Sequence, residues 1–279
     1  MLTLSLFFFA MQSIELGTES IPGCVLQIYV LLTTSEKLGT GALMSIASSA
    51  LTTGFTSALI SFDTDVDVKK RQASPKLYGI IPDDYAQRGT CFILMMLIST
   101  LHNLSRSIGC AVLAASSGKM ILTYFVCGEM LVYLAYKVFR RDFMCWVRVD
   151  GILGVIMSII IRIISKLIVD FSGCLHFRHP FELGGAAFTL STLFAHVMPF
   201  FALWLYKEQD DHDVPNEEIE VTTTNSTQPN NDTSNEIDVS SILFYLMCSF
   251  ALWLLLNIAF FCTIDLSYVH SFFGIETGE

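Results

Sequence analysis

Charged side chains inside long apolar runs are the residues of this chain best suited to chemistry. An ionised side chain at the centre of a membrane helix costs about 2.5–3.5 kcal/mol, so it faces the bundle interior or water. There it can transfer protons, bind a polar ligand or fix the contact between helices. The candidates for an intramembrane function are Glu15, Glu19, Gln27, His102, Arg106, Glu129, Arg162, Lys166 and Asp170.

The first group of candidates follows one helix face. Around Pro22, polar and small residues recur at three- and four-residue steps, at Gln12, Glu15, Glu19, Gly23 and Gln27. This spacing predicts a polar stripe on a broken helix. The stripe either lines a hydrophilic groove or leaves Glu15 at the membrane interface with Glu19 buried.

Two further groups carry most of the buried charge. His102 and Arg106 are one helical turn apart, and Glu129 interrupts the next apolar run. We predict an ion pair between Arg106 and Glu129, which serves function or fixes the register of two helices. One later run carries polar residues at four-residue steps, at Ser158, Arg162, Lys166 and Asp170.

Arg162 needs a partner within the bundle. Lys166 and Asp170 are near enough to the end of their run to reach the interface, whereas Arg162 is deeper. A carboxylate partner is therefore expected for Arg162, with Glu15 and Glu19 as the candidates.

Apolar runs of membrane-spanning length position these residues. The chain has 279 residues, of which 53% are hydrophobic and 15% charged, with a mean hydropathy of +0.57. Soluble domains have about 25% charged residues. Because backbone groups in lipid must be hydrogen-bonded internally, the runs predict helices. We expect an all-α, polytopic integral membrane bundle with about seven spans, at 13–34, 38–62, 90–115, 118–138, 147–170, 183–206 and 241–263.

The spans divide the chain into a bundle at 1–206, an acidic disordered loop at 207–240, and a last helix with a short tail at 241–279. Basic residues concentrate in the loops near 69–88 and 137–148, which predicts that both loops are cytoplasmic. Strict alternation then places the acidic loop in the cytoplasm as well. A re-entrant span would instead place it outside, where Asn225 and Asn231 could be glycosylated.

Small residues at strict four-residue spacing mark the second span as a packing helix. The series is Gly41, Ser45, Ser49, Thr53, Ser57 and Ser61. Such residues let another backbone approach closely and supply hydroxyls for hydrogen bonds between helices. We read the series as packing and expect this helix to be buried in the bundle.

Other functional classes have little support in the sequence. Catalytic, P-loop and dinucleotide-binding motifs do not occur, so we predict neither an enzyme nor a cofactor. Cys174, His176 and His179 are close together, but their spacing matches no standard zinc site, and we predict no metal. His196 followed by Pro199 indicates a kinked helix. The chain has no basic, aromatic-interleaved patch for nucleic acid.

The first span also resembles a known family. The run from Glu19 to Val30, ESIPGCVLQIYV, is similar to the Glu-Ser/Ala-x-Pro-Gln-x-x-Leu-Gln-x-Tyr signature of the XK-related membrane proteins. The matching positions are Glu19, Ser20, Pro22, Leu26, Gln27 and Tyr29, while Gly23 replaces the usual Gln. The resemblance implies an all-helical protein with buried charges and, for some members, phospholipid scrambling between leaflets.

Three functions remain open from the sequence. The resemblance and the polar stripes favour scrambling or other lipid handling, with membrane lipids as partners. The alternatives are a solute or proton-coupled transporter, and a non-catalytic scaffold that binds a second membrane subunit. The sequence indicates a multi-pass membrane protein without distinguishing the plasma membrane from an endomembrane.

Overall fold

The computed structural model describes residue 11 and residues 14–34, 39–73, 78–139, 151–172, 193–204 and 239–264. Within these residues every regular element is helical. The elements are η1 (Leu16–Ser20), α2 (Ile21–Thr33), α3 (Thr40–Val66), α4 (Val68–Ala73), α5 (Tyr85–Phe139), α6 (Ile152–Ser172), the helix Leu193–Trp204 and α8 (Val239–Thr263). The predicted all-α fold is therefore confirmed.

Six helical segments in the described part are long and apolar enough to cross a membrane: Leu16–Thr33, Thr40–Val66, Tyr85–Ala115, Met120–Phe139, Ile152–Phe171 and Leu243–Thr263. They correspond to six of the seven predicted spans. The remaining prediction, 183–206, overlaps the shorter apolar helix Leu193–Trp204. Residues 207–238 of the predicted acidic loop, with Asn225 and Asn231, and the loop with Cys174 lie outside the described residues, whereas Val239 and Ser240 belong to α8.

The first membrane segment contains a change of helix type. η1 is a five-residue π-helix that leads directly into α2, and the N–H of Ile21 bonds to the carbonyl of Leu16. Pro22 follows at the start of α2. Proline has no N–H to donate and its ring crowds the preceding turn, so a widened turn fits at this position. The break that the sequence predicts at Pro22 is thus a π-helical turn within a continuous segment.

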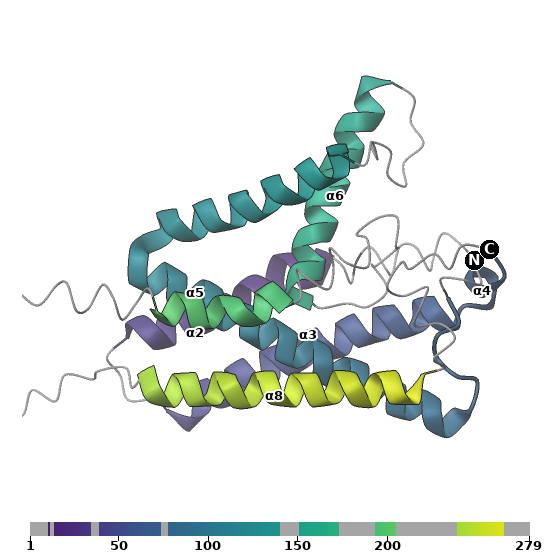
Figure 1. Cartoon of the computed structure of the whole chain (residues 1–279), viewed down its shortest axis with the longest axis horizontal. Coiled ribbons are helices and arrows are strands. Elements are labelled where there is room, and N and C mark those ends of the chain that lie inside the picture. Colours follow the sequence, from purple (N-terminus) through teal and green to yellow (C-terminus); the bar gives the residue numbers. More distant parts are fainter. Residues whose placement is uncertain are drawn as a thin grey trace, which may run out of the picture.

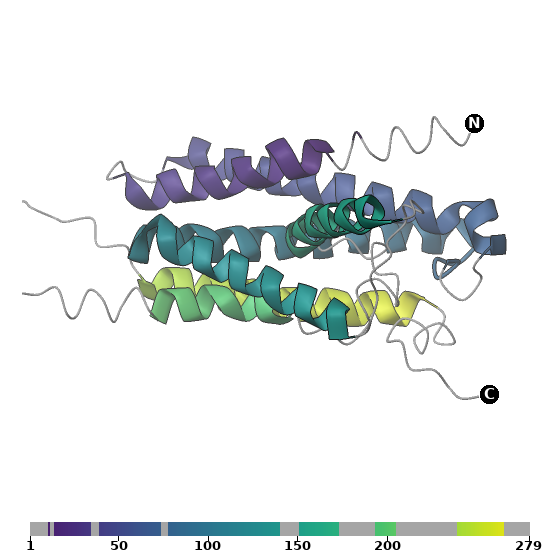
Figure 2. The same ribbon diagram turned by 90° about the horizontal axis from the view of Figure 1, so that it is seen from above.

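Helix α5 is the centre of the bundle, and it contacts α2, α3, α6 and α8. Its 55 residues contain two span-length parts, Tyr85–Ala115 and Met120–Phe139. Between them α5 turns back sharply, so the second part runs in the opposite direction (Figures 1 and 2). One element thereby contributes two adjacent walls of the bundle.

The contact between α3 and α5 is close enough to require glycine. A Cβ atom added to Gly54 would lie 2.0 Å from Oγ1 of Thr100 and 2.8 Å from the carbonyl oxygen of Met96. Near this contact, the hydroxyls of Ser57 and Ser99 are 3.2 Å apart in a buried hydrogen bond. Small residues thus bring the two backbones together, as is typical of membrane helices.

The predicted packing series follows this contact over only half of α3. Thr53, Ser57 and Ser61 are at most 1% exposed. Ser49 is half-buried, whereas Gly41 and Ser45 are exposed. The small-residue series is therefore buried only in the second half of α3, whereas in the first half Ile46 and Ala50 share a buried cluster with Ala111 of α5.

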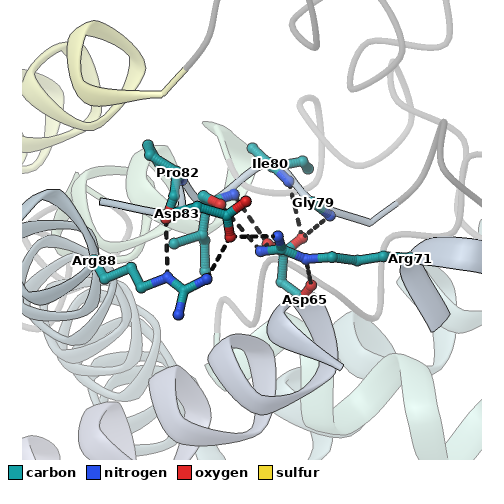
Figure 3. Close-up of polar contacts among 8 residues, drawn as sticks. Asp65, Arg71, Gly79, Ile80, Pro82, Asp83 and Arg88 are labelled. Carbon is teal, nitrogen blue, oxygen red and sulfur yellow. Dashed lines mark hydrogen bonds and ion pairs between the residues drawn. The ribbon is translucent and has the colours of Figure 1, made fainter. Parts of the chain in front are cut away.

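A cluster of polar contacts fixes the connection from α3 to α5 (Figure 3). Asp65, at the end of α3, is fully buried. Its carboxylate accepts hydrogen bonds from the N–H groups of Gly79 (2.9 Å), Ile80 (3.2 Å) and Ile81 (2.9 Å). Gly79 has a φ of +94°, a conformation that favours glycine. The loop therefore wraps its backbone donors around a single buried acid, as in an anion-binding nest.

Arg71 on α4 completes this arrangement, which we call the Asp65 clamp. Its Nε donates to the carbonyl of Asp65 at 2.7 Å, and its Nη2 donates to the carbonyl of Ile81 at 3.1 Å. On the outer side, Asp83 pairs with Arg71 and with Arg88 of α5. These hydrogen bonds, Arg88 first, lower the pKa of Asp83, whereas burial and the nearby Asp65 raise the pKa of Tyr78.

Candidate functional site

Four of the predicted ionisable residues form one connected charge network, namely Arg106, Glu129, Lys166 and Asp170. Arg106 on the first part of α5 bonds to Glu129 on the second part. Lys166 on α6 lies 3.8 Å from Glu129 and also pairs with Asp170 one turn later on the same helix. The predicted pair between Arg106 and Glu129 is therefore present, and α6 extends it into a network.

The network is buried within the bundle. The side chain of Arg106 is 2% exposed, those of Lys166 and Asp170 are 7% exposed, and that of Glu129 is 15% exposed. Ion pairs at such depth are strengthened by the low dielectric constant, but they also carry a large desolvation cost. Apolar residues could hold the same helices together at lower cost, which favours a functional role for the network.

Aromatic rings cover the two cations of the network. The guanidinium carbon of Arg106 lies 5.4 Å from the ring centroid of Phe125 and 5.5 Å from that of Phe171. The Nζ of Lys166 lies 5.6 Å from the ring centroid of Tyr133. These distances are in the range of cation–π contacts, which stabilise a cation away from water. The rings therefore replace part of the lost hydration.

Arg106 has hydrogen-bonding capacity that the described part of the protein does not use. Its Nη2 bonds to Glu129. Its Nε and Nη1 are buried and have no hydrogen-bond partner among the described residues. Guanidinium groups present their donors in a fork that matches a phosphate or carboxylate. The unused edge of Arg106 is thus suited to an anionic group.

His102 connects the network to a second polar region. Its Nε2 lies 2.7 Å from the backbone carbonyl oxygen of Asp170. A carbonyl can only accept, so Nε2 carries the proton of this bond. The ring centroids of His102 and His196 are 5.3 Å apart. The ring centroid of His196 lies 4.1 Å from that of Trp253 on α8. His196 is therefore a buried contact residue between helices.

An apolar cavity of about 600 Å³ lies beside the network. It is bounded by η1 and α2, by the first part of α5 and by α6. The lining residues are Gly17, Ile21, Pro22, Val25, Leu26, Tyr29, Ala114, Leu167, Ile168 and Phe171. Phe171 belongs both to this wall and to the cover of Arg106. The cavity and the charge network thus meet at one side chain.

Three of the six residues that carry the family resemblance, Pro22, Leu26 and Tyr29, line this cavity. The polar candidates of the same span lie elsewhere. Glu15, Glu19 and Gln27 are exposed on the described structure. They do not belong to the charge network.

Arg162 is buried on α6, at 3% exposure, one turn before Lys166. Among the ion pairs between described residues, none joins Arg162 to Glu15 or Glu19. The expected ion pair between Arg162 and a carboxylate of the first span is therefore not part of the charge network. The network forms because α5 turns back on itself and places Glu129 next to Arg106 and Lys166.

Several residues of the site were missed by reasoning from the sequence. Phe125, Tyr133 and Phe171 look like ordinary membrane residues, and only their position next to a cation distinguishes them. The sequence predicts Lys137 in a cytoplasmic loop, but Lys137 is 2% exposed and its Nζ lies 5.9 Å from the ring centroid of Tyr133. Its spacing of four residues from Tyr133 is the signal that could have revealed this contact.

The described residues contain no group of three or more His, Cys, Asp or Glu side chains that could hold a metal ion. The site consists of an apolar cavity, a buried charge network and Phe171, which contacts both. Comparison of the chain with known protein families, with curated proteins and with solved structures gave no match, so the resemblance to the XK-related proteins stays a prediction.

Proposed function

We propose that this integral membrane protein handles phospholipids, with the acyl chains in the apolar cavity and the polar headgroup stabilised by the charge network. The observation that carries this proposal is the contact of Phe171 with both the cavity wall and Arg106. An amphipathic ligand needs an apolar and a charged environment side by side. The apolar cavity and the adjacent charge network provide these two environments.

The cost of moving a phospholipid between leaflets lies in its headgroup, so the charged part of the site is the part that would lower this cost. Moving an acyl chain from the bilayer into an apolar cavity gains little, because lipid tails are as apolar as the cavity wall. Moving an ionised headgroup into hydrocarbon is costly. The buried donors of Arg106 that Glu129 leaves unused would offset this cost at membrane depth. These donors would therefore lower the barrier to headgroup movement between leaflets.

The test is movement of a fluorescent phospholipid between leaflets of liposomes that contain the purified protein. An impermeant quencher removes about half of the fluorescence when only the outer leaflet is accessible. Quenching well beyond half, reduced in Arg106→Gln and retained in Lys69→Gln, would support the proposal. Lys69 is an exposed cation on α4 and so serves as the matched control.

The result must be interpreted on folded protein. Each variant should elute as a single symmetrical peak and keep the helical circular dichroism of the unmodified protein. Equal quenching by the unmodified protein and folded Arg106→Gln would contradict a role for the network. Quenching that stops at half for every sample would contradict lipid scrambling itself.

A second candidate is a proton-coupled transporter. The hydrogen bond from His102 to the backbone carbonyl of Asp170 favours it, because it holds a titratable ring next to the buried charge network, and histidine can take part in proton transfer. In that case an imposed pH gradient would drive uptake of a solute into liposomes, and His102→Gln would abolish the dependence on the gradient. A lipid scramblase would show no such dependence.

A further inference from the structure

We propose that Phe171 is the partition that controls access from the apolar cavity to a phosphate-binding edge of Arg106. This inference deepens the proposed function, because it names the group that the site recognises and the residue that regulates access. The ligand is the phosphate of a membrane lipid. The test below measures equilibrium binding and does not depend on lipid movement between leaflets.

The position of Phe171 supports this role. It lies in the last turn of α6, one residue before the helix ends at Ser172. Its side chain lines the cavity, and its ring lies 5.5 Å from the guanidinium carbon of Arg106. Arg106 itself is 2% exposed and does not belong to the cavity wall. A ligand in the cavity therefore meets Phe171 before it meets Arg106.

The chemistry of Arg106 indicates what would replace the ring. Nε and Nη1 of Arg106 are buried donors without a partner among the described residues. A phosphate can accept two parallel hydrogen bonds from such an edge, and this charge-assisted contact is stronger than a cation–π contact. Rotation of the Phe171 side chain would exchange the ring for the phosphate. The apolar tails would remain in the cavity.

Phe125 provides a matched control within the same site. Its ring lies 5.4 Å from the guanidinium carbon of Arg106, close to the 5.5 Å of Phe171. Phe125 does not line the cavity. Removal of either ring deletes one cation–π interaction, but only removal of the Phe171 ring joins the cavity to Arg106. Comparison of the two variants thus distinguishes the effect of opening a path from the cavity to Arg106 from the effect of losing one cation–π contact.

The experiment is calorimetric titration of the full-length protein in detergent with a short-chain phosphatidic acid. Diacylglycerol with the same chains, which lacks the phosphate, and inorganic phosphate are titrated in parallel. We expect Phe171→Ala to bind phosphatidic acid about fivefold more tightly than the unmodified protein, which corresponds to about 1 kcal/mol. Phe125→Ala should not show this gain, and the change in diacylglycerol binding, which reports only the altered cavity wall at Phe171, should be smaller than the change for phosphatidic acid.

The double variant with Phe171→Ala and Arg106→Gln should lose the gain. Equal gains for Phe171→Ala and Phe125→Ala, a gain that persists without Arg106, or an equal gain for diacylglycerol would overturn the inference. Phe171→Leu is the second variant, because it also removes the ring while it leaves more apolar packing to support the fold. Absence of a gain from both folded Phe171 variants would also overturn the inference.

The parallel titrations distinguish this inference from the proposed function. A gain with inorganic phosphate alone, absent with phosphatidic acid, would overturn a lipid source for the phosphate. A gain with phosphatidic acid in a protein that scrambles no lipid would support the partition and contradict only the scrambling function.

Discussion

Replacement of Asp65 by asparagine should severely destabilise the protein, because the Asp65 clamp depends on one buried carboxylate. Asparagine keeps one acceptor oxygen but replaces the other by an NH₂ donor. That donor would face the N–H of Ile81 or the guanidinium of Arg71, both of which are donors themselves. The substitution thus turns attractive interactions into donor–donor repulsion in a buried site.

The magnitude follows from the hydrogen bonds and the ion pair that the carboxylate makes. A buried N–H left without an acceptor costs about 1–3 kcal/mol. Removing one member of a buried ion pair costs about 3–5 kcal/mol, and this range is an upper limit here because Arg71 is 21% exposed and still pairs with Asp83. We therefore expect the free energy of unfolding to fall by roughly 2–4 kcal/mol in total. For chains of about 150–250 residues each kcal/mol lowers Tm by about 2–4 °C, which predicts a decrease of at least about 4 °C here.

The assay is thermal unfolding of the purified protein in detergent, followed by circular dichroism at several scan rates. Asp83→Asn is the matched control, because Asp83 also pairs with Arg71 but is 80% exposed. Exposed ion pairs contribute little to stability. A Tm of Asp65→Asn that equals that of Asp83→Asn would refute the reasoning that burial, rather than pairing, gives the clamp its strength.

Three further predictions use the same assay. Gly54→Ala should lower Tm markedly, because the added Cβ atom has no room against α5. Gly41→Ala, on an open part of the same helix, should leave Tm unchanged. Similar Tm values for the two variants would contradict the close contact. Glu129→Met should be destabilising, and adding Arg106→Met should restore much of the stability, because a buried pair replaced by apolar residues is nearly neutral; no recovery in the double variant would argue against their pairing. The pKa of Asp83 is lowered in the folded protein. Its pairing therefore stabilises the folded state at pH values above about 4, which is the pKa of an aspartate in the unfolded chain. This contribution is lost as the pH falls through the folded pKa. The difference in Tm between the unmodified protein and Asp83→Asn should therefore shrink on acidification from about pH 7 to about pH 3, and a constant difference would contradict it.

The sequence predicted the membrane helices well, because their signal is a local run of apolar residues. Six predicted spans correspond to helices of the structure. The pair between Arg106 and Glu129 was also predictable, since a buried charge needs an opposite charge and these residues lie on consecutive spans. Both inferences depend on properties of neighbouring segments alone.

The remaining features depend on three-dimensional placement that the pattern does not encode. The polar stripe at Glu15 and Glu19 suggested a partner for Arg162, but the direction in which a helix face points depends on its neighbours. The role of Phe171 follows from the cavity beside it, and that of Asp65 from backbone N–H groups fourteen or more residues away. Hydrogen bonds between a side chain and backbone groups this far along the chain do not follow from the residue types.

The return of α5 also has a consequence for how the chain enters the membrane. Arg106 and Glu129 belong to two consecutive segments joined without a long loop, so both can leave the translocon as one helical hairpin. Each charge alone would oppose insertion by about 2.5–3.5 kcal/mol. Paired within the hairpin, they would partly offset one another before α6 is synthesised. We therefore expect α5 to act as a single unit of membrane insertion.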